Sequence, residues 1–356
     1  MKNMRGYMAK TVFLGMSGGV DSSLSAVLLK EAGYHVVGVY MKNWSKDLPG
    51  MKCPWAEDLA DAKRVATKLD IDFLVFDFEE AYKKKVVDYM LAEFKAGRTP
   101  NPDIMCNEEI KFKLFFEESL KRGADFIATG HYAKSENDQL KLATDENKDQ
   151  TYFLYRISKQ AVEKTIFPLS NLRKPEVKRL ASEKGLKNAY KKESMGVCFV
   201  GDVGMKDFLR EYIDLKPGEI RELETEKVLG VHDGAVFYTV GQRHGLYIGG
   251  GLPYYVVKKD LRKNIVYVSK NLNEKNLWTK EIKLENIFFR ETTEQTEQSL
   301  RVRLRHRAPL LPASLKMTGE KTGLISLKDE TKRIAPGQSV VFYKDDVCLG
   351  GGIVKD

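Results

Sequence analysis

The first 200 residues alternate short apolar runs with stretches of helical periodicity. Strand-like runs occupy residues 12–16, 35–41, 71–78 and 126–133, and helical spacing of apolar residues follows residue 20 and recurs over 57–70, 79–97 and 107–122. Strands that alternate with helices are typical of βαβ units. The pattern therefore predicts an α/β fold with a doubly wound parallel sheet that helices cover on both faces.

The pattern changes beyond about Gly201. One further helix is predicted over residues 205–213, followed by short strands separated by Gly, Asp and Pro. Residues 236–246 and 253–260 are strand-like, and a strong block of strands runs from about Glu281 onward. We expect three domains: an α/β domain over residues 1–207, a small central linking domain over 208–275, and a terminal β-barrel or sandwich over 276–356.

The turn after the first predicted strand favours a phosphate ligand. Gly18 and Gly19 permit close approaches that a side chain prevents, and the free N–H groups of the next helix point into the turn. Asp21 and Ser22 stand where a Walker loop has its lysine and hydroxyl residue, which indicates another use of ATP. The alternative interpretation is an ordinary strand-to-helix turn with a serine cap.

Met41 and Gly130 also fall at the carboxyl ends of predicted strands. Ligands of parallel sheets bind at these ends. We therefore expect both residues to share one pocket with the glycine turn.

Charge and hydropathy restrict the class of protein. The chain has 59 Lys and Arg against 50 Asp and Glu, a formal charge of +9, which suits a polyanionic partner without proving one. No uninterrupted apolar stretch approaches the ~20 residues needed to span a bilayer. The first apolar run is broken by the glycine turn, unlike a signal peptide. We expect a cytosolic protein without a membrane anchor.

The four cysteines are dispersed: Cys53, Cys106, Cys198 and Cys348. This spacing predicts neither a disulfide framework nor a metal site, and it offers no cluster for an iron–sulfur centre. Cys348 is interpreted as a core residue and Cys53 as structural or incidental, and Cys198, taken by itself, is also compatible with a core strand position.

A proline-rich segment precedes Cys106. Pro100 and Pro102 oppose helix and predict a rigid exposed loop, after which Cys106 begins a helix. A thiol near a helix N-terminus is favoured as thiolate, although two glutamates follow it. Asp103 is close enough in sequence to act as an acid or base. A buried free cysteine is the alternative.

Two segments suit a polyanion. Lys148, Asp149 and Gln150 precede an aromatic run. Farther on, basic and apolar residues alternate, which on a strand would align four arginines on one face: Arg301, Arg303, Arg305 and Arg307. Arginine suits bidentate contacts with phosphate, so this stripe predicts a nucleic-acid surface, with a solvated strand face as the alternative.

Successive motifs resemble one family over nearly the whole chain. They are "GMSGGVDSS", "AGRTPNPDIMCNEEIKF", "ATGHYA", "KDQTYFLY", "GVCFVG", "TVGQRHGL", "APGQSVVFY" and "CLGGGI". In this order they resemble the tRNA-specific 2-thiouridylases, members of the PP-loop ATP pyrophosphatase superfamily. The resemblance implies a Rossmann-like (HUP) PP-loop domain, a small central domain and a C-terminal β-barrel. It also implies that ATP adenylates the C2 oxygen of the wobble uridine of tRNA, which a persulfide sulfur then replaces.

The resemblance also implies residue roles. The ATP-binding residues would be Gly15, Met16, Ser17, Gly18, Gly19, Val20, Asp21, Ser22, Met41 and Gly130. Asn101, Pro102 and Asp103 would contact the target base, with Asp103 as acid or base. Cys106 is similar to the family's nucleophile and Cys198 to its persulfide carrier, and the two would form a disulfide after sulfur release. The tRNA-contacting positions would be Lys148, Asp149, Gln150, Arg305 and His306.

Two residues depart from the family pattern. Met195 stands where bacterial members often have a smaller residue, and His306 stands where tyrosine is common, although its ring can still stack on a base.

The implied ligands are ATP with Mg²⁺, and the implied partners are tRNA and a persulfide-carrying donor protein, with the enzyme a monomer. Two other classes share the glycine turn: a synthetase that amidates a small molecule, and a non-catalytic RNA-binding protein. The first would need neither the arginines nor two dispersed cysteines.

Overall fold

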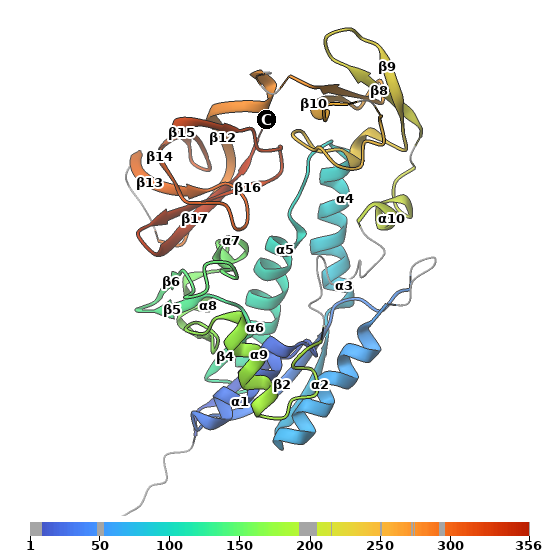
Figure 1. Ribbon diagram of the computed structural model, residues 1–356. Coiled ribbons are helices and arrows are strands. Elements are labelled where there is room, and N and C mark those ends of the chain that lie inside the picture. The colour runs from blue at the N-terminus through green and yellow to red at the C-terminus, as the bar shows by residue number, and fades with distance from the viewer. Residues whose placement is uncertain are drawn as a thin grey trace, which may run out of the picture. The chain divides into compact units, whose positions relative to one another are not determined.

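The computed structural model describes residues 9–47, 53–191, 205–214, 216–249, 251–271, 273, 275–291 and 296–355. It divides into two compact units, whose elements are labelled in Figure 1. The first unit comprises residues 1–86, 103–202 and 346–348, and the second comprises 87–102, 203–345 and 349–356. Met195 and Cys198 lie outside the described residues.

The first unit is built on a parallel sheet. Its strands are β1 (Thr11–Gly15), β2 (His35–Lys42), β3 (Asp72–Asp77), β4 (Phe126–Thr129) and β7 (Thr165–Ile166). They lie in the order β3-β2-β1-β4-β7, and every neighbouring pair is parallel. The direction of winding reverses between β1 and β4, which is where such sheets bind ligands.

Helices cover both faces of this sheet. Helices α1 (Val20–Glu31), α2 (Trp55–Leu69) and α9 (Lys174–Glu183) share an apolar core with alternate strand residues such as Val12 and Leu14. Phe13 points to the other face and is also buried, and α6 (Phe115–Lys121) packs on β4. The predicted α/β fold with a doubly wound parallel sheet is confirmed.

The remaining elements of the first unit connect this framework. They are α3 (Glu79–Tyr82), the π-helical segments η1 (Lys83–Val87) and η2 (Cys106–Leu114), α5 (Pro102–Met105), the hairpin β5 (Lys134–Glu136) and β6 (Gln139–Lys141), α7 (Thr151–Leu154) and α8 (Lys159–Glu163). Among the described residues, no helix combines the length and apolar character needed to cross a bilayer.

The helix that contains Cys106 begins earlier than the sequence predicts. It starts at Pro102 and continues through η2 and α6 to Lys121. Proline is favoured at a first helical position, because its missing N–H would have no partner there. Cys106 therefore lies one turn inside the helix, beyond the free N–H groups. The prediction that Cys106 begins the helix is wrong.

The second unit contains α4 (Asp88–Lys95), α10 (Met205–Arg210) and a four-stranded sheet. The strands β8 (Gly218–Glu222), β9 (Val228–His232), β10 (Tyr255–Asp260) and β11 (Ile265–Ser269) lie in the order β10-β11-β8-β9. Residues 236–246, predicted as a strand, instead contain part of the short helix η3 (Ala235–Phe237) and irregular turns. Gly241 and Gly245 adopt positive φ there, which interrupts an extended backbone.

The last part of the second unit follows the short helix η4 (Lys275–Leu277) and is a closed barrel of six strands. The strands are β12 (Trp278–Phe289), β13 (Glu297–Arg303), β14 (Leu311–Gly319), β15 (Thr322–Lys332), β16 (Ser339–Lys344) and β17 (Val347–Val354). Their order is β12-β15-β14-β13-β16-β17, and β12 also pairs with β17 to close the ring. Leu284, Val302 and Phe342 are among the residues that fill its interior. The predicted C-terminal β-barrel is confirmed.

Candidate active site

The glycine turn fits tightly between two neighbours. Gly18 has φ +76°, and a Cβ at this position would lie 2.5 Å from the carbonyl oxygen of Asp58 in α2. Gly130, which follows β4, is also close-packed, because its Cβ would lie 2.9 Å from the backbone of Asp21 and Ser22. Any side chain at either glycine would displace the turn.

The start of α1 has no side-chain cap. Its N-cap residue is Gly19, and the N-cap position makes no side-chain cap hydrogen bond. The hydroxyls of Ser22 and Ser23 instead donate to the Gly19 carbonyl, at 3.1 and 2.9 Å. The serine-capped alternative is therefore wrong, and the first-turn N–H groups of α1 are oriented as a phosphate site requires.

Asp21 is held by a buried cation that sequence reasoning missed. Lys174 Nζ donates to both carboxylate oxygens of Asp21 at 2.7 Å, and the hydroxyl of Tyr132 donates to Oδ1 at 3.0 Å. The Lys174 side chain is only 8% exposed, while that of Asp21 is 31% exposed. A positive charge thus lies directly beside the glycine turn, supplied by a helix 153 residues farther along the chain.

Met41 lies against the end of β1. Its Cε would be 2.9 Å from a Cβ on Gly15, so the two positions are in close contact. The first unit therefore brings the predicted nucleotide residues together: the turn from Gly15 to Ser22, Met41 and Gly130.

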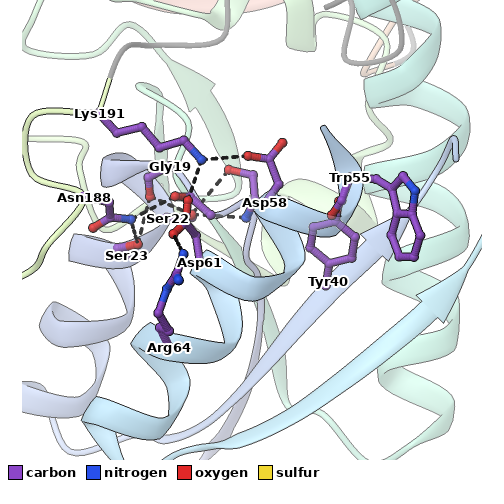
Figure 2. Close-up of polar contacts among 12 residues, drawn as sticks. Gly19, Ser22, Ser23, Tyr40, Trp55, Asp58, Asp61, Arg64, Asn188 and Lys191 are labelled. Atoms are coloured by element: carbon purple, nitrogen blue, oxygen red, sulfur yellow. Dashed lines mark hydrogen bonds and ion pairs between the residues drawn. The ribbon is translucent and has the colours of Figure 1, made fainter. Parts of the chain in front are cut away.

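A polar network connects this turn to α2 and to residues 188–191 (Figure 2). Asn188 Nδ2 donates to the Gly18 carbonyl at 2.9 Å. Lys191 Nζ donates to Asp58 Oδ1 at 2.8 Å and to Asp61 Oδ2 at 2.6 Å. Spacing alone gives no indication of these contacts, since the partners are more than 120 residues apart.

The Cys106 helix is tied to the segment after Gln150. Asn107 Nδ2 donates to the carbonyl of Phe153 in α7 at 3.1 Å. Arg156 Nε donates to Glu108 Oε2 at 2.5 Å, and although burial opposes it, this pairing raises the pKa of Arg156. Cys106 itself is buried and forms no disulfide with another described cysteine.

Asp103 and His131 have pKa values shifted in opposite directions. Burial raises the pKa of Asp103, against the opposing charge of Lys111. Burial also lowers the pKa of His131 well below its ordinary value, and Lys111 adds to that shift. His131 Nδ1 lies 2.9 Å from the hydroxyl of Thr129. His131 is therefore neutral at pH 7. The carboxyl of Asp103 takes up a proton more readily than an exposed aspartate does.

The segment from Lys148 to Gln150 is partly structural. Asp149 is 1% exposed, and its carboxylate accepts hydrogen bonds from Ala143 N at 2.8 Å and from the Thr151 hydroxyl at 2.6 Å. Gln150 exchanges hydrogen bonds with the backbone of Tyr132. Contact between this segment and tRNA stays a prediction, and at Asp149 it would involve the backbone.

The prediction that four arginines line one face of a strand is wrong. β13 ends at Arg303, and Arg305 and Arg307 lie in the following turn, where Arg307 has φ +64°. Arg303 is 7% exposed and packs over the Tyr343 ring at 5.3 Å. Arg301, Arg305 and Arg307 remain exposed.

Asn101, Pro102, Arg305 and His306 belong to the second unit. There, the backbone before Asn101 is fixed by the barrel segment 336–338: Thr99 N donates to the Pro336 carbonyl at 2.8 Å, and Gln338 Nε2 donates to the Thr99 carbonyl at 2.6 Å.

Cys53 and Cys348 are buried, in line with structural roles. Over the described ranges, no group of three His, Cys, Asp or Glu side chains is arranged to hold a metal ion.

Comparison with known proteins decides the family. Residues 10–202 match the model of a tRNA methyl transferase HUP domain, residues 206–270 its PRC-barrel domain, and residues 279–354 an aminomethyltransferase β-barrel domain. The tRNA-specific 2-thiouridylase MnmA of Bacillus licheniformis is 44% identical over 353 residues, which are 97% of this chain and 95% of that protein. The protein of the same name from Listeria monocytogenes is 45% identical over 96% of this chain and 94% of its own length. The chain belongs to the tRNA-specific 2-thiouridylase family.

Solved structures resemble parts of this 2-thiouridylase family member. A 4-thiouridine synthetase in complex with RNA and bound ATP matches 54% of this chain and 45% of its own, at 19% identity and a TM-score of 0.38. The NMN synthetase of Francisella tularensis matches 53% of this chain and 68% of its own, at 16% identity and a TM-score of 0.35. The family assignment rests on the sequence relatives.

Proposed function

We propose that this enzyme is a tRNA-uridine 2-sulfurtransferase, which uses ATP to form 2-thiouridine at the wobble position. The observation that carries the proposal is the 44% identity, over 97% of the chain, to a relative named as a tRNA-specific 2-thiouridylase. We further propose a catalytic domain over residues 1–207, a linking domain over 208–275 and a barrel domain over 276–356.

The glycine turn would hold the β,γ-pyrophosphate of ATP. The uncapped N–H groups of α1 favour negative charge at this place, and the ammonium of Lys174 offsets the charge of Asp21 beside them. The close packing at Gly18 and Gly130 supports the fit, because both glycines keep side chains out of the turn. Mg²⁺ usually binds through substrate phosphates and one or two carboxylates, and Asp21 is the carboxylate in the turn that could join them.

Adenylation makes the C2 oxygen of uridine a leaving group. The C2 oxygen attacks the α-phosphorus of ATP, pyrophosphate leaves, and the product is an O-adenylated base. Asn101, Pro102 and Asp103 would hold that base. Because burial raises the pKa of Asp103, its carboxyl is suited to exchange a proton with the base near neutral pH.

Sulfur transfer would use two cysteines. Cys198 would receive a persulfide from a donor protein, and the Cys106 thiolate would attack the inner sulfur, which forms a Cys106–Cys198 disulfide and releases hydrosulfide. Hydrosulfide then adds to C2 and AMP leaves. An external thiol reduces the disulfide before the next turnover.

The substrate is tRNA, and Lys148, Asp149, Gln150, Arg305 and His306 would contact it. The exposed arginines and the formal charge of +9 support binding to a polyanion. We also propose that the enzyme acts in the cytosol as a monomer.

The test incubates the protein with ATP, Mg²⁺, sulfide and unmodified tRNA, followed by mass spectrometry of the nucleosides. We expect 2-thiouridine, AMP and pyrophosphate, all dependent on both tRNA and ATP. Pyrophosphate release without tRNA would favour a small-molecule synthetase, and tRNA binding without ATP cleavage would favour a binding protein. ADP as the product would refute the adenylation chemistry.

The cysteine roles are tested with a persulfide donor. Cys198→Ser should keep adenylation and lose transfer, whereas Cys106→Ser should accept sulfur on Cys198 and fail to release it. Cys53→Ser and Cys348→Ala are the controls, with any loss at Cys348 appearing as instability of about 1 kcal/mol. Full turnover by either serine variant at position 106 or 198 would exclude the two-cysteine mechanism.

A further inference from the structure

The segment that leads to Asn101 begins at the end of helix α4 in the second unit. Gly97 follows this helix with φ +79°, the left-handed conformation that commonly ends a helix. Gly97 N donates to the Phe94 carbonyl at 2.8 Å, and Arg98 N donates to the Glu93 carbonyl at 2.9 Å. The helix end is therefore a closed turn, and it sets the direction of the chain beyond it.

A lysine of the four-stranded sheet binds this helix end. Lys259 in β10 donates from Nζ to the Gly97 carbonyl at 2.9 Å, although the two residues are 162 positions apart (Figure 1). A Cβ on Gly97 would collide with the side chain of Leu261, which follows β10 directly. The end of one strand thus supplies both a hydrogen bond and an apolar contact to the end of α4.

The position of Lys259 is unfavourable for its charge. Its side chain is partly buried, and burial lowers the pKa of its ammonium to about 8. Over the described ranges Lys259 forms no ion pair, so the Gly97 carbonyl and the negative end of the α4 dipole are what favour the charge. An apolar side chain would fill the same space without the desolvation cost. The ammonium is therefore better explained by the carbonyl that it holds than by stability.

The residues after Gly97 are held as well. The Thr99 hydroxyl lies 3.2 Å from the hydroxyl of Thr239, and the N–H and carbonyl of Thr99 both form hydrogen bonds with the barrel. Pro100, with its restricted φ, is the only residue between Thr99 and Asn101. A displacement of Gly97 would therefore be passed on to Asn101, because the short connection cannot absorb it.

We propose that Lys259 is a positioning residue that determines where Asn101 and Pro102 hold the target base of tRNA. The inference rests on the proposed function, which assigns the base to those two residues. Lys259 acts through the Gly97 carbonyl, at the helix end from which the base-binding segment starts. The central domain thereby takes part in the reaction, since one of its strands fixes that helix end.

The test compares Lys259→Met, Lys259→Arg and the control Lys258→Met. Lys258 is the exposed neighbour on the same strand, and its ammonium lies over the Tyr267 ring. Pyrophosphate release is measured at increasing tRNA concentrations with saturating ATP, and tRNA affinity is measured separately by filter binding.

We expect Lys259→Met to lose at least about tenfold in kcat and to bind tRNA within about threefold of the unaltered protein. A misplaced base costs rate steeply, whereas phosphate contacts supply most of the affinity. Lys259→Arg should recover most of the lost kcat, because a guanidinium can also donate to the Gly97 carbonyl. Lys258→Met should match the unaltered protein in both measurements.

A second readout does not require turnover. Hydrogen exchange is measured by mass spectrometry on peptides that cover residues 93–101. We expect the amides of Gly97 and Arg98 to exchange faster in Lys259→Met and at the unaltered rate in Lys259→Arg and Lys258→Met. The midpoint of thermal unfolding should not fall in Lys259→Met, since the substitution removes a buried charge.

Parallel losses of kcat and tRNA affinity in Lys259→Met would overturn the proposal, because they would make Lys259 a tRNA contact or a support of the fold. Unchanged kcat would overturn it too, as would unaltered hydrogen exchange at the end of α4. Failure of the unaltered protein to release pyrophosphate with tRNA would instead refute the proposed function and the assignment of the base. Hydrogen exchange would then still show whether Lys259 fixes the helix end.

Discussion

Two regions of the molecule were predicted to bind phosphate groups, the glycine turn and the segment from Arg301 to Arg307. Their structures differ. The glycine turn is packed on both sides, and the N–H groups at the start of α1 and the buried Lys174–Asp21 ion pair lie beside it. The segment from Arg301 to Arg307 presents separate exposed side chains at the end of a barrel strand and in the turn that follows. The first region is suited to a single pyrophosphate, and the second to the diffuse field of a nucleic acid.

This contrast shows which sequence patterns predict a site by themselves and which also depend on the fold. Glycine at a tight turn is required by backbone geometry, so that motif is informative without knowledge of the fold. Alternating arginines share one face only as far as the strand that contains them continues. Here β13 ends at Arg303, which is buried over Tyr343.

The largest expected effect is at Asp21. Asp21→Ala should reduce ATP cleavage at least about a hundredfold, because removing charge-assisted contacts from the transition state costs several kcal/mol. It should also lower the free energy of unfolding by about 2 kcal/mol, since the buried Lys174 would lose its ion pair with Asp21. Stopped-flow pyrophosphate release and urea unfolding measure the two effects.

The double variant Asp21→Ala with Lys174→Met is the control for this prediction. It should regain stability and remain inactive. If the double variant were no more stable than Asp21→Ala, the Asp21–Lys174 pair would not be the cause of the instability.

The next effect tests the packing of the glycine turn. Gly18→Ala should cost about 3 kcal/mol in stability, because the new methyl group would need positive φ and would also meet the Asp58 carbonyl. Gly33→Ala is the matched control: its φ is +84°, but nothing lies within 4 Å of the added Cβ, so only about 1 kcal/mol should be lost. Equal losses in thermal unfolding would show that packing on Asp58 is unimportant.

The arginine segment gives a smaller effect. Arg305→Ala should lower the slope of log affinity for tRNA against log salt by roughly one unit, as expected when one phosphate contact is lost. Arg303→Met should leave the slope unchanged and instead cost about 1 kcal/mol of stability through the lost contact with Tyr343. Filter-binding titrations at several salt concentrations distinguish the two variants. A change of slope in Arg303→Met would show that Arg303 contacts tRNA after all.

The smallest effect concerns His131, which is kept uncharged beside the glycine turn. Because its folded pKa is lowered, the unfolded chain binds the proton first as pH falls below about 6.5, so stability is lost on acidification down to the folded pKa. His131→Gln should remove about 1 kcal/mol of that pH dependence. Urea unfolding between about pH 5 and 7.5 measures it, and an unaltered pH profile in the variant would show that His131 does not titrate as expected.

The class of fold and the place of the candidate nucleotide site follow from the amino-acid sequence. Periodicity of about 2 and 3.6 residues separates strands from helices locally, and parallel strands must present their carboxyl ends at one edge. Gly18, Asp21, Met41 and Gly130 can therefore be assigned to one site from their positions along the chain. The long motifs indicate the family.

The partners of these groups depend on tertiary structure. Lys174 reaches Asp21, and Asn188 and Lys191 reach the glycine turn and α2, across more than 120 residues of chain. The ends of elements depend on it too: the Cys106 helix begins at Pro102, and β13 ends before Arg305. The physical reason is that caps, ion pairs and strand ends depend on which segments pack together, whereas periodicity and glycine geometry are properties of the local chain.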